Sequence, residues 1–138
     1  MEIKHKHLSV ENKIDELPAL AAMLEQLTDE WNLNPGLAMN LNLVIEEAIT
    51  NVVFYAYDDK QTHFIDIDFE LDGNEFSIMI KDDGKPFDPT QKTDPDISLS
   101  VDDRQIGGLG IFLIRKIMDK VSYRRENKKN ILTLVKTL

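Results

Sequence analysis

Two long segments near the N-terminus repeat apolar residues every three to four positions. In residues 14–31 this repeat predicts a helix whose buried stripe is Leu17, Leu20, Ala21, Leu24 and Leu27. The break Asn34-Pro35-Gly36 follows, and Asn34 and Pro35 are typical of the cap and the first position of a helix. We therefore expect a second helix from Pro35 to about Tyr57.

Shorter segments alternate apolar and polar residues and predict strands. Residues 63–71 (HFIDIDFEL) and 75–82 (EFSIMIKD) flank Asp72-Gly73-Asn74, which is a hairpin turn signal. Looser alternation in residues 2–8 predicts an edge strand, and the segments VSYRR and ILTLVKTL around residues 127–130 predict a second hairpin. Because the acidic residues of 63–71 share one side, we expect a sheet with one packed and one solvated face.

Periodicity disappears from residue 84 to about residue 106, where Pro86, Pro89 and Pro95 disfavour helix and strand. A loop of that length in a small domain is typically a lid, a binding loop or a disordered segment. The sequence GGLGIFLIRKIMDK follows and predicts a third helix over residues 111–118. The order βααββ, loop, αββ predicts an α/β (α+β) two-layer sandwich, in which a mostly antiparallel mixed sheet carries three helices on one face.

Composition and charge narrow the class of protein. A chain of 138 residues without a compositional break is expected to form one domain, residues 1–138. The first residues do not resemble a signal peptide and no apolar run approaches the roughly 20 residues that span a bilayer, so we expect a cytoplasmic protein without a membrane partner. The formal net charge of −9 disfavours nucleic acid. The absence of cysteine excludes disulfides and thiolate chemistry.

Two polar residues stand out in the apolar second helix. Glu47 and Asn51 lie four positions apart and so share one side of the helix, at the border of its apolar stripe. Glu46 and Thr50 instead point toward water. A carboxylate at such a border suits a base or a metal partner, and an amide oxygen suits Mg²⁺. The alternative is that both residues only form structural hydrogen bonds.

An aspartate continues the buried face of a predicted strand. Phe76, Ile78 and Ile80 share that face by their period of two, and Asp82 is the next member of the series. A buried carboxylate is costly without a hydrogen-bond donor, and an adenine amino group is one such donor. The alternative is that the strand has already ended and that Asp82 begins a solvated Asp-Asp-Gly turn.

A glycine cluster precedes the third helix. Gly107, Gly108 and Gly110 would allow a ligand to approach the backbone, and the free N–H groups of a helix N-terminus favour phosphate. The spacing matches neither G-x-G-x-x-G nor a phosphate loop that ends in G-K-[ST]. A glycine-rich hinge without a ligand is the alternative.

Three sequence segments occur in the order EEAITNVVFYAY, DDGKPFDP and GGLGIFLIRKIMD. Together they resemble the motifs of the GHKL ATP-binding superfamily of gyrase, MutL, Hsp-type chaperones and histidine kinases. Within it they look most like the anti-sigma-factor serine kinases of bacteria. The resemblance extends from about Pro35 to the end of the chain. It implies a Bergerat-type ATP-binding fold, ATP and Mg²⁺ as cofactors, and a sigma factor and an anti-sigma antagonist as partners. The first helix is a candidate contact surface for a homodimer or for the sigma factor, although we expect its apolar stripe to belong first of all to the core.

The resemblance also implies roles for matching residues. Asn51 would hold Mg²⁺, Glu47 would be the general base, and Asp82 would accept the adenine amino hydrogen. Residues from about 84 to 106 would form the ATP lid. The remaining assignments are Gly84 for close backbone approach, Gly107, Gly108, Leu109 and Gly110 for the phosphate-binding helix, Arg104 for the terminal phosphate, and Thr133 as a support for Asp82. Two departures from the family pattern, Tyr55 and Pro86, bear on affinity more than on chemistry.

The expected activity is that of an ATP-dependent protein serine/threonine kinase that phosphorylates an anti-sigma antagonist and binds a sigma factor. Glu47 separates this function from that of a histidine kinase, because an imidazole acceptor needs no general base. A gyrase-like hydrolase normally needs additional domains. The remaining alternative is a non-catalytic module, in which ATP only orders the lid and so exposes or hides a partner surface.

Overall fold

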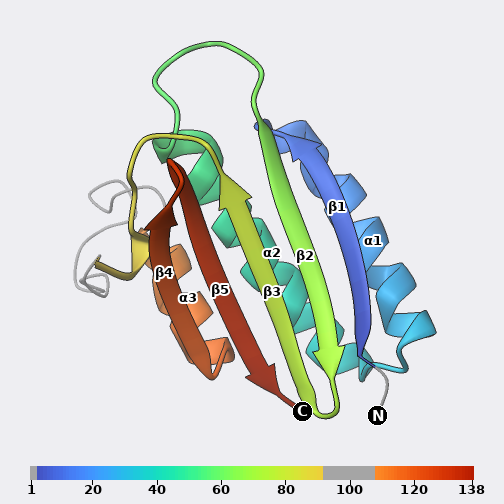
Figure 1. Ribbon diagram of the computed structural model, residues 1–138. Helices are drawn as coiled ribbons and strands as arrows, with labels where there is room; N and C mark the ends of the chain where they lie inside the picture. The colour runs from blue at the N-terminus through green and yellow to red at the C-terminus, as the bar shows by residue number, and fades with distance from the viewer. Residues whose placement is uncertain (1–2, 92–107) are drawn as a thin grey trace.

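The computed structural model describes residues 3–91 and 108–138 (Figure 1). In chain order its elements are β1 (Lys4–Glu11), a 3-10 turn (Ile14–Glu16), α1 (Leu17–Glu30), α2 (Pro35–Tyr55), β2 (Phe64–Asp72), β3 (Glu75–Asp82), a 3-10 turn (Pro89–Gln91), α3 (Gly108–Ile117), β4 (Lys120–Glu126) and β5 (Lys129–Thr137). The predicted order of helices and strands is therefore confirmed. Two boundaries differ, since β1 starts two residues later than predicted and ends at Glu11, and α3 begins at Gly108 rather than at Ile111.

The strands form one five-stranded sheet in the order β1-β2-β3-β5-β4. Each neighbouring pair is antiparallel, so the mixed pairing in our expectation is not found among the described strands. The two hairpins β2–β3 and β4–β5 join through β3 and β5. This pairing brings the C-terminal end of β3 beside the start of β5.

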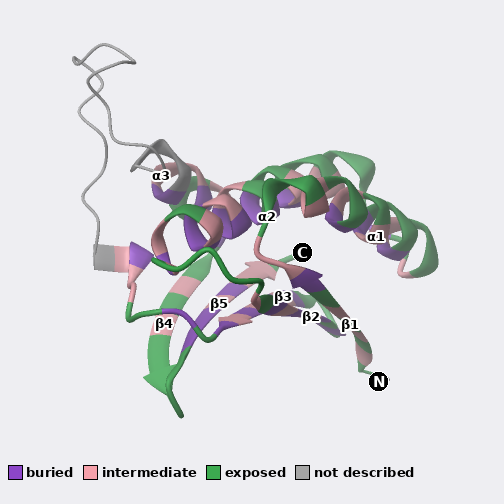
Figure 2. Ribbon diagram, turned by 90° about the horizontal axis from the view of Figure 1, so that it is seen from above, coloured by how far each residue is buried: buried purple, intermediate pink, exposed green. Residues whose placement is uncertain are grey.

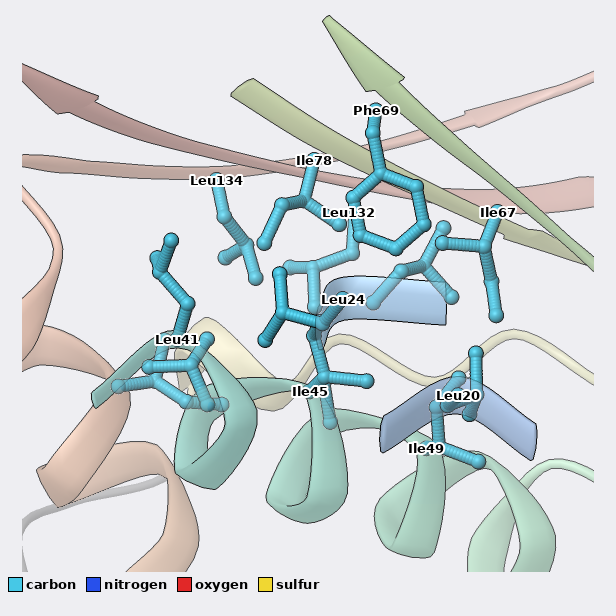
Figure 3. Close-up of a cluster of buried hydrophobic side chains, with 14 of the residues drawn as sticks. Leu20, Leu24, Leu41, Ile45, Ile49, Ile67, Phe69, Ile78, Leu132 and Leu134 are labelled. Carbon is cyan, nitrogen blue, oxygen red and sulfur yellow. The ribbon is translucent and has the colours of Figure 1, made fainter. Parts of the chain in front are cut away.

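The helices cover a single face of the sheet, which confirms the predicted two-layer sandwich (Figure 2). α2 lies between α1 and α3 in this layer. The core fills the space between the layers (Figure 3). Its fully buried side chains include Leu20, Leu24, Leu41, Ile45, Ile49, Ile67, Phe69, Ile78 and Leu134. Burial of this many large aliphatic and aromatic groups supplies the main driving force of folding.

α2 is the central helix, and the two residues Asn34 and Pro35 determine where it starts. The side chain of Asn34 accepts hydrogen bonds from the backbone N–H groups of Gly36 (2.8 Å) and Leu37 (3.3 Å), and Pro35 occupies the first helical position. By length and composition alone α2 could cross a membrane, although we expected no apolar stretch of sufficient length. In the fold its apolar stripe instead packs on the sheet.

The opposite face of the sheet carries polar side chains. His5 and His7 of β1 lie 3.0 and 2.9 Å from the same carboxylate oxygen of Asp68 on β2. Within the described ranges no group of three His, Cys, Asp or Glu side chains is arranged to hold a metal ion. Asp66, Asp68 and Glu70 therefore serve here as the solvated face that the alternating pattern predicts.

The β4–β5 hairpin and its pairing with β3 bring two polar residues of the site together. Asn127 and Lys128 form its turn with positive φ angles of 51° and 63°, the conformation of a tight two-residue hairpin. β5 starts directly after this turn, and its separate pairing with β3 places Asn130 opposite Asp82 at the end of β3. A buried amide and a buried carboxylate thus become neighbours, although 47 residues separate them along the chain.

Loss of the α2 cap should destabilise the whole domain. Asn34→Ala removes the acceptor for two N–H groups, and we expect a loss of about 1 kcal/mol in the free energy of unfolding, measured by urea denaturation. Asn40→Ala is the matched control, because Asn40 is exposed within the same helix and alanine is the better helix former. An equal loss in both variants would contradict the role of the cap.

Candidate functional site

A small pocket lies between the C-terminal half of α2 and the β3–β5 part of the sheet. It encloses about 20 Å³, which is room for about one water molecule. Its lining combines apolar side chains with a few polar ones and consists of Ala48, Asn51, Val52, Ile80, Asp82, Phe87, Pro89, Tyr123, Asn130 and Leu132. Two of the residues predicted from the sequence, Asn51 and Asp82, therefore meet in one pocket.

Asn51 is the most unusual polar group of the pocket. Its side chain is 2% exposed, and neither its amide nitrogen nor its amide oxygen has a hydrogen-bond partner in the part of the chain that the structure describes. A buried polar group left unpaired costs on the order of 1–3 kcal/mol. Such groups are rare in folded proteins and call for an explanation such as a ligand. The alternative of a purely structural border asparagine is thus not supported by any hydrogen bond.

Glu47 lies one helical turn before Asn51 and is partly buried. Burial, and then the neighbouring charge of Glu46, raise the pKa of the Glu47 carboxyl above its ordinary value. A raised pKa suits a carboxylate that accepts a proton near neutral pH. Glu46 is exposed, as predicted, and Thr50 donates its hydroxyl hydrogen to the Glu46 carbonyl (2.6 Å). Glu47 itself is not among the residues that line the enclosed pocket.

Asp82 is buried at the end of β3, where it is 5% exposed. The strand continues through this residue, so the alternative of a solvated turn at Asp82 is wrong. One carboxylate oxygen accepts hydrogen bonds from the backbone N–H of Gly84 (2.9 Å) and from the Asn130 side chain (2.9 Å). Burial raises the pKa of the Asp82 carboxyl, and these two hydrogen bonds oppose the rise. Among the residues that the structure describes, the donors that hold Asp82 in place all engage one of its two oxygens.

Asn130 is a site residue that our sequence interpretation missed. Its amide nitrogen donates to Asp82 and to the carbonyl oxygen of Lys85 (2.8 Å), while its amide oxygen accepts from the backbone N–H of Phe87 (3.3 Å). One side chain thereby orients the buried carboxylate and holds the backbone that follows it. The sequence placed Asn130 directly after a predicted turn. It gave no signal that the last strand would pair with the strand of Asp82 in a register that makes the two residues neighbours.

Two further side chains complete this network from β4. The amide oxygen of Asn130 also accepts from the Tyr123 hydroxyl (2.5 Å) and from the Arg125 guanidinium (3.1 Å). The same guanidinium nitrogen of Arg125 donates to the carbonyl oxygen of Gly84 (2.7 Å). The segment that leaves β3 is thus tied to both strands of the last hairpin.

Thr133 does not lie beside Asp82. It pairs with Met79 and with Ser122, three positions along β5 from Asn130. Because side chains alternate along a strand, this odd spacing puts Thr133 on the sheet face opposite to that of Asn130. The expected support of Asp82 comes from Asn130 instead.

Gly84 has a structural reason to be glycine. A Cβ atom at this position would lie 2.3 Å from the carbonyl oxygen of Ala56 and 2.7 Å from its Cβ. The neighbouring N–H of Lys85 donates to the same Ala56 carbonyl (2.8 Å). The close approach at Gly84 is therefore to the C-terminal end of α2, and any side chain there would push the loop away from the helix.

The start of the predicted lid lies over the pocket. Phe87 stacks on Tyr55 of α2, with ring centroids 5.3 Å apart and an interplanar angle of 18°. Arg115 of α3 donates to the carbonyl oxygen of Thr90. Both contacts join this segment to the helical layer. Within the segment, Pro89 is buried and lines the pocket.

The glycine cluster is described only in part. Gly108, Leu109 and Gly110 form the first turn of α3, so two of the glycines belong to the helix rather than to the loop before it. Gly107 and Arg104, predicted to contact phosphates, lie outside the described residues. α3 packs against α2, the helix that carries Glu47 and Asn51.

Comparison with known protein families gives a match to the histidine kinase-like ATPase domain over residues 10–136. The chain belongs to this family. The match includes nearly all the described elements, among them α2, β3, α3 and β5, which carry most of the predicted site residues.

Curated relatives of this chain are named protein kinases. The chain is 36% identical over 108 residues to the serine/threonine-protein kinase BtrW of Bordetella bronchiseptica. This alignment covers 78% of the chain and 75% of the relative. It is 35% identical to the serine-protein kinase RsbW of Halalkalibacterium halodurans, with 72% of this chain and 62% of the relative covered. RsbW of a Staphylococcus aureus strain is 37% identical, with coverages of 62% and 57%.

Solved structures show the same fold at low sequence identity. A crystal structure of the RsbU and RsbW domains of a Mycobacterium tuberculosis protein superimposes with a TM-score of 0.66 at 13% identity, covering 98% of this chain and 32% of that one. The histidine kinase domain of a blue-light activated kinase from Erythrobacter litoralis gives 0.57 at 13% identity, with coverages of 91% and 60%. These similarities establish the fold of the ATPase domain.

Asp82→Asn should separate the structural role of this side chain from ligand recognition. The variant retains an oxygen that accepts from Gly84 and Asn130, but it places an N–H donor where the second carboxylate oxygen was. The family resemblance implies that this oxygen accepts the adenine amino hydrogen, so a donor would then face a donor. We therefore expect the affinity for an adenine nucleotide to fall at least about tenfold in calorimetric titration. Asp83→Asn is the control, because Asp83 is exposed and contacts Tyr57. Equal losses in both variants would contradict this register.

The same variant should change how stability depends on pH. Because burial raises the pKa of Asp82 above 3.8, the folded protein binds more protons than the unfolded chain between 3.8 and the raised value. This carboxyl therefore lowers stability as the pH rises through that window. Asp82→Asn should remove the decrease in the free energy of unfolding that this carboxyl causes as the pH rises. Chemical denaturation at several pH values measures this free energy.

Proposed function

We propose that this chain binds ATP together with Mg²⁺ in the pocket between α2 and the sheet. The observation that carries the proposal is the unpaired, buried amide of Asn51. Its oxygen is a ligand of the hard type that Mg²⁺ prefers. Membership of a family of ATPase domains supports ATP as the nucleotide.

Each polar residue of the site has a distinct task in this proposal. Asp82 accepts the amino hydrogen of adenine through the oxygen that Asn130 does not engage. The Asn51 amide oxygen holds the metal, which when bound supplies charge neutralisation for phosphoryl transfer. Glu47 accepts the proton of the attacking hydroxyl, for which its raised pKa is suited.

Nucleotide binding requires the pocket to open. The enclosed 20 Å³ is much too small for a base, and Phe87 and Pro89 close one side of it. The contacts that hold this segment include two hydrogen bonds with Asn130, which donates to the Lys85 carbonyl and accepts from the Phe87 N–H. The Lys85 N–H also donates to the Ala56 carbonyl, Arg115 donates to the Thr90 carbonyl, and Phe87 stacks on Tyr55. We propose that ATP displaces residues 85–91 from the pocket, as expected for the first part of a lid.

The acceptor that we propose is a serine or threonine hydroxyl of another protein, an anti-sigma antagonist, with a sigma factor as second partner in the cytoplasm. The names of the relatives as serine- and serine/threonine-protein kinases support the acceptor. A carboxylate base one turn before the metal-binding amide also supports it, since a hydroxyl must lose a proton to attack phosphate. A homodimer stays a prediction.

The second candidate is a non-catalytic module in which ATP only repositions the loop. The closed pocket favours it, because opening residues 85–91 would by itself change the surface next to α3, where Arg115 contacts Thr90. Nucleotide binding without transfer would then be sufficient for function.

Asn51→Leu should make the protein more stable but unable to bind ATP with Mg²⁺. Removing the unpaired amide and filling the space with an apolar side chain should raise the free energy of unfolding by about 1 kcal/mol and abolish Mg²⁺-dependent ATP binding. Urea denaturation and calorimetry measure the two effects. Asn40→Leu is the matched control on the exposed side of α2. Retention of metal-dependent binding by Asn51→Leu would refute the site.

Glu47→Gln tests catalysis against simple binding. With labelled ATP, Mg²⁺ and an antagonist protein, we expect transfer to serine to fall about 10²–10⁴-fold, whereas the affinity for ATP stays within about twofold because Glu47 does not line the base pocket. Glu46→Gln, one residue away and exposed, should leave transfer unchanged. Wild-type protein that binds ATP but transfers no phosphoryl group to any antagonist would support the non-catalytic module.

A further inference from the structure

The helical layer carries a groove between α1 and α2 that the nucleotide pocket does not use. It consists of two adjoining hollows of about 210 and 430 Å³, which share Ala21 and Asn42. Most of its lining is apolar and includes Leu17, Leu20, Leu24, Ala38, Met39 and Ile45. Met39 is 71% exposed at its edge, so a large hydrophobic side chain faces water here.

The charged side chains that line this groove are all acidic. Glu25 and Asp29 of α1 and Glu46 of α2 line it, and all three are exposed. None of the three forms an ion pair with any described residue. An apolar floor edged by unpaired charges of one sign is typical of a binding surface rather than of a solvated helix pair, in which both signs are interspersed.

Charge is segregated along this chain. Residues 14–55, which include α1 and α2, contain seven acidic residues and no lysine or arginine. Residues 111–138 contain eight lysine or arginine residues and only two acidic ones. The acidity of the groove is therefore a local property and not only a consequence of the net charge of −9. Such a surface attracts a cationic partner and repels an anionic one.

We propose that this groove docks a basic amphipathic helix of a partner protein. The groove extends along α1 from Leu17 to Asp29, about 20 Å at the rise of an α-helix, which accommodates about 13 residues of a bound helix. Apolar residues spaced three and four apart would cover Met39 and the floor. Lysine or arginine on the flanks would pair with Glu25, Asp29 and Glu46.

This proposal does not depend on the proposed nucleotide chemistry. The groove and the nucleotide pocket share no lining residue. Docking measured without ATP therefore reports on the groove alone, and its failure leaves the proposed kinase activity unaffected.

A fluorescent synthetic peptide tests the groove directly. The probe is a helical 14-residue peptide, about the length the groove accommodates, with leucines on one side and lysines on both flanks. Two control peptides replace every lysine by glutamate or scatter the leucines around the helix. Anisotropy titration against the full chain without nucleotide should show binding of the first peptide only.

Charge variants locate the bound peptide. Glu25→Lys should weaken binding about fivefold, because one attraction becomes a repulsion, and it should give the glutamate-flanked peptide measurable affinity. Glu70→Lys makes the same change in net charge at an exposed position of β2 and should alter affinity less than about twofold. Met39→Glu should abolish binding of the lysine peptide by placing a charge at the apolar edge.

Three results would overturn the proposal. Equal weakening by Glu25→Lys and Glu70→Lys would show general charge attraction instead of docking in the groove. Equal binding of the scattered-leucine peptide would remove the apolar contribution. Absence of binding at millimolar peptide, together with self-association of the chain that Met39→Glu disrupts, would assign the groove to a second copy of this chain.

Discussion

The contact between Asp82 and Asn130 holds the candidate site together. It joins the end of β3 to the start of β5 through a 2.9 Å hydrogen bond between two buried side chains. The same amide holds the backbone at Lys85 and Phe87, and through them the segment that closes the pocket. Because a buried carboxylate needs donors, replacing Asn130 by an apolar residue would remove one of the two described donors to Asp82 and two of the hydrogen bonds that hold the loop.

α2 has to satisfy two opposing requirements. Its apolar stripe supplies much of the core, with Leu41, Val44, Ile45, Ala48 and Ile49 at most 1% exposed. One turn of the same helix carries the partly buried Glu47, whose carboxyl pKa is raised by burial. It also carries Asn51, whose buried amide has no hydrogen-bond partner among the described residues and therefore costs stability. A protein keeps such groups where binding or catalysis needs them. The stable part of the helix therefore positions the unfavourable part.

The two binding surfaces that we infer lie on different sides of the helical layer. The nucleotide pocket lies between this layer and the sheet, while the acidic groove opens outward between α1 and α2. α2 contributes to both, with Asn51 on the inner side and Met39 and Glu46 on the outer side. A partner that shifts α2 along the sheet would thus alter the pocket as well, which offers a physical route for coupling the two sites.

The sequence by itself determined the order of the elements, the two-layer arrangement and the burial of Asp82. These features follow from local periodicity, because the alternation that buries Phe76, Ile78 and Ile80 also buries Asp82. That Asn51 and Asp82 belong to one site was expected only from the family resemblance, and the structure places both in the lining of one pocket. Only the tertiary structure decided which residue supports Asp82. Thr133 and Asn130 both lie on the last strand, and the pairing of β5 with β3 puts Asn130 opposite Asp82 and Thr133 opposite Met79.

Two other features also depend on contacts between distant segments. Gly84 packs against Ala56, and Phe87 stacks on Tyr55, so the pocket is closed by residues that periodicity assigns to an irregular loop. The groove likewise requires α1 and α2 to lie side by side, which brings Glu25 and Glu46 to one rim. Local patterns in a sequence report which face of an element is buried, but the partners across that face are set by packing between elements far apart in the chain.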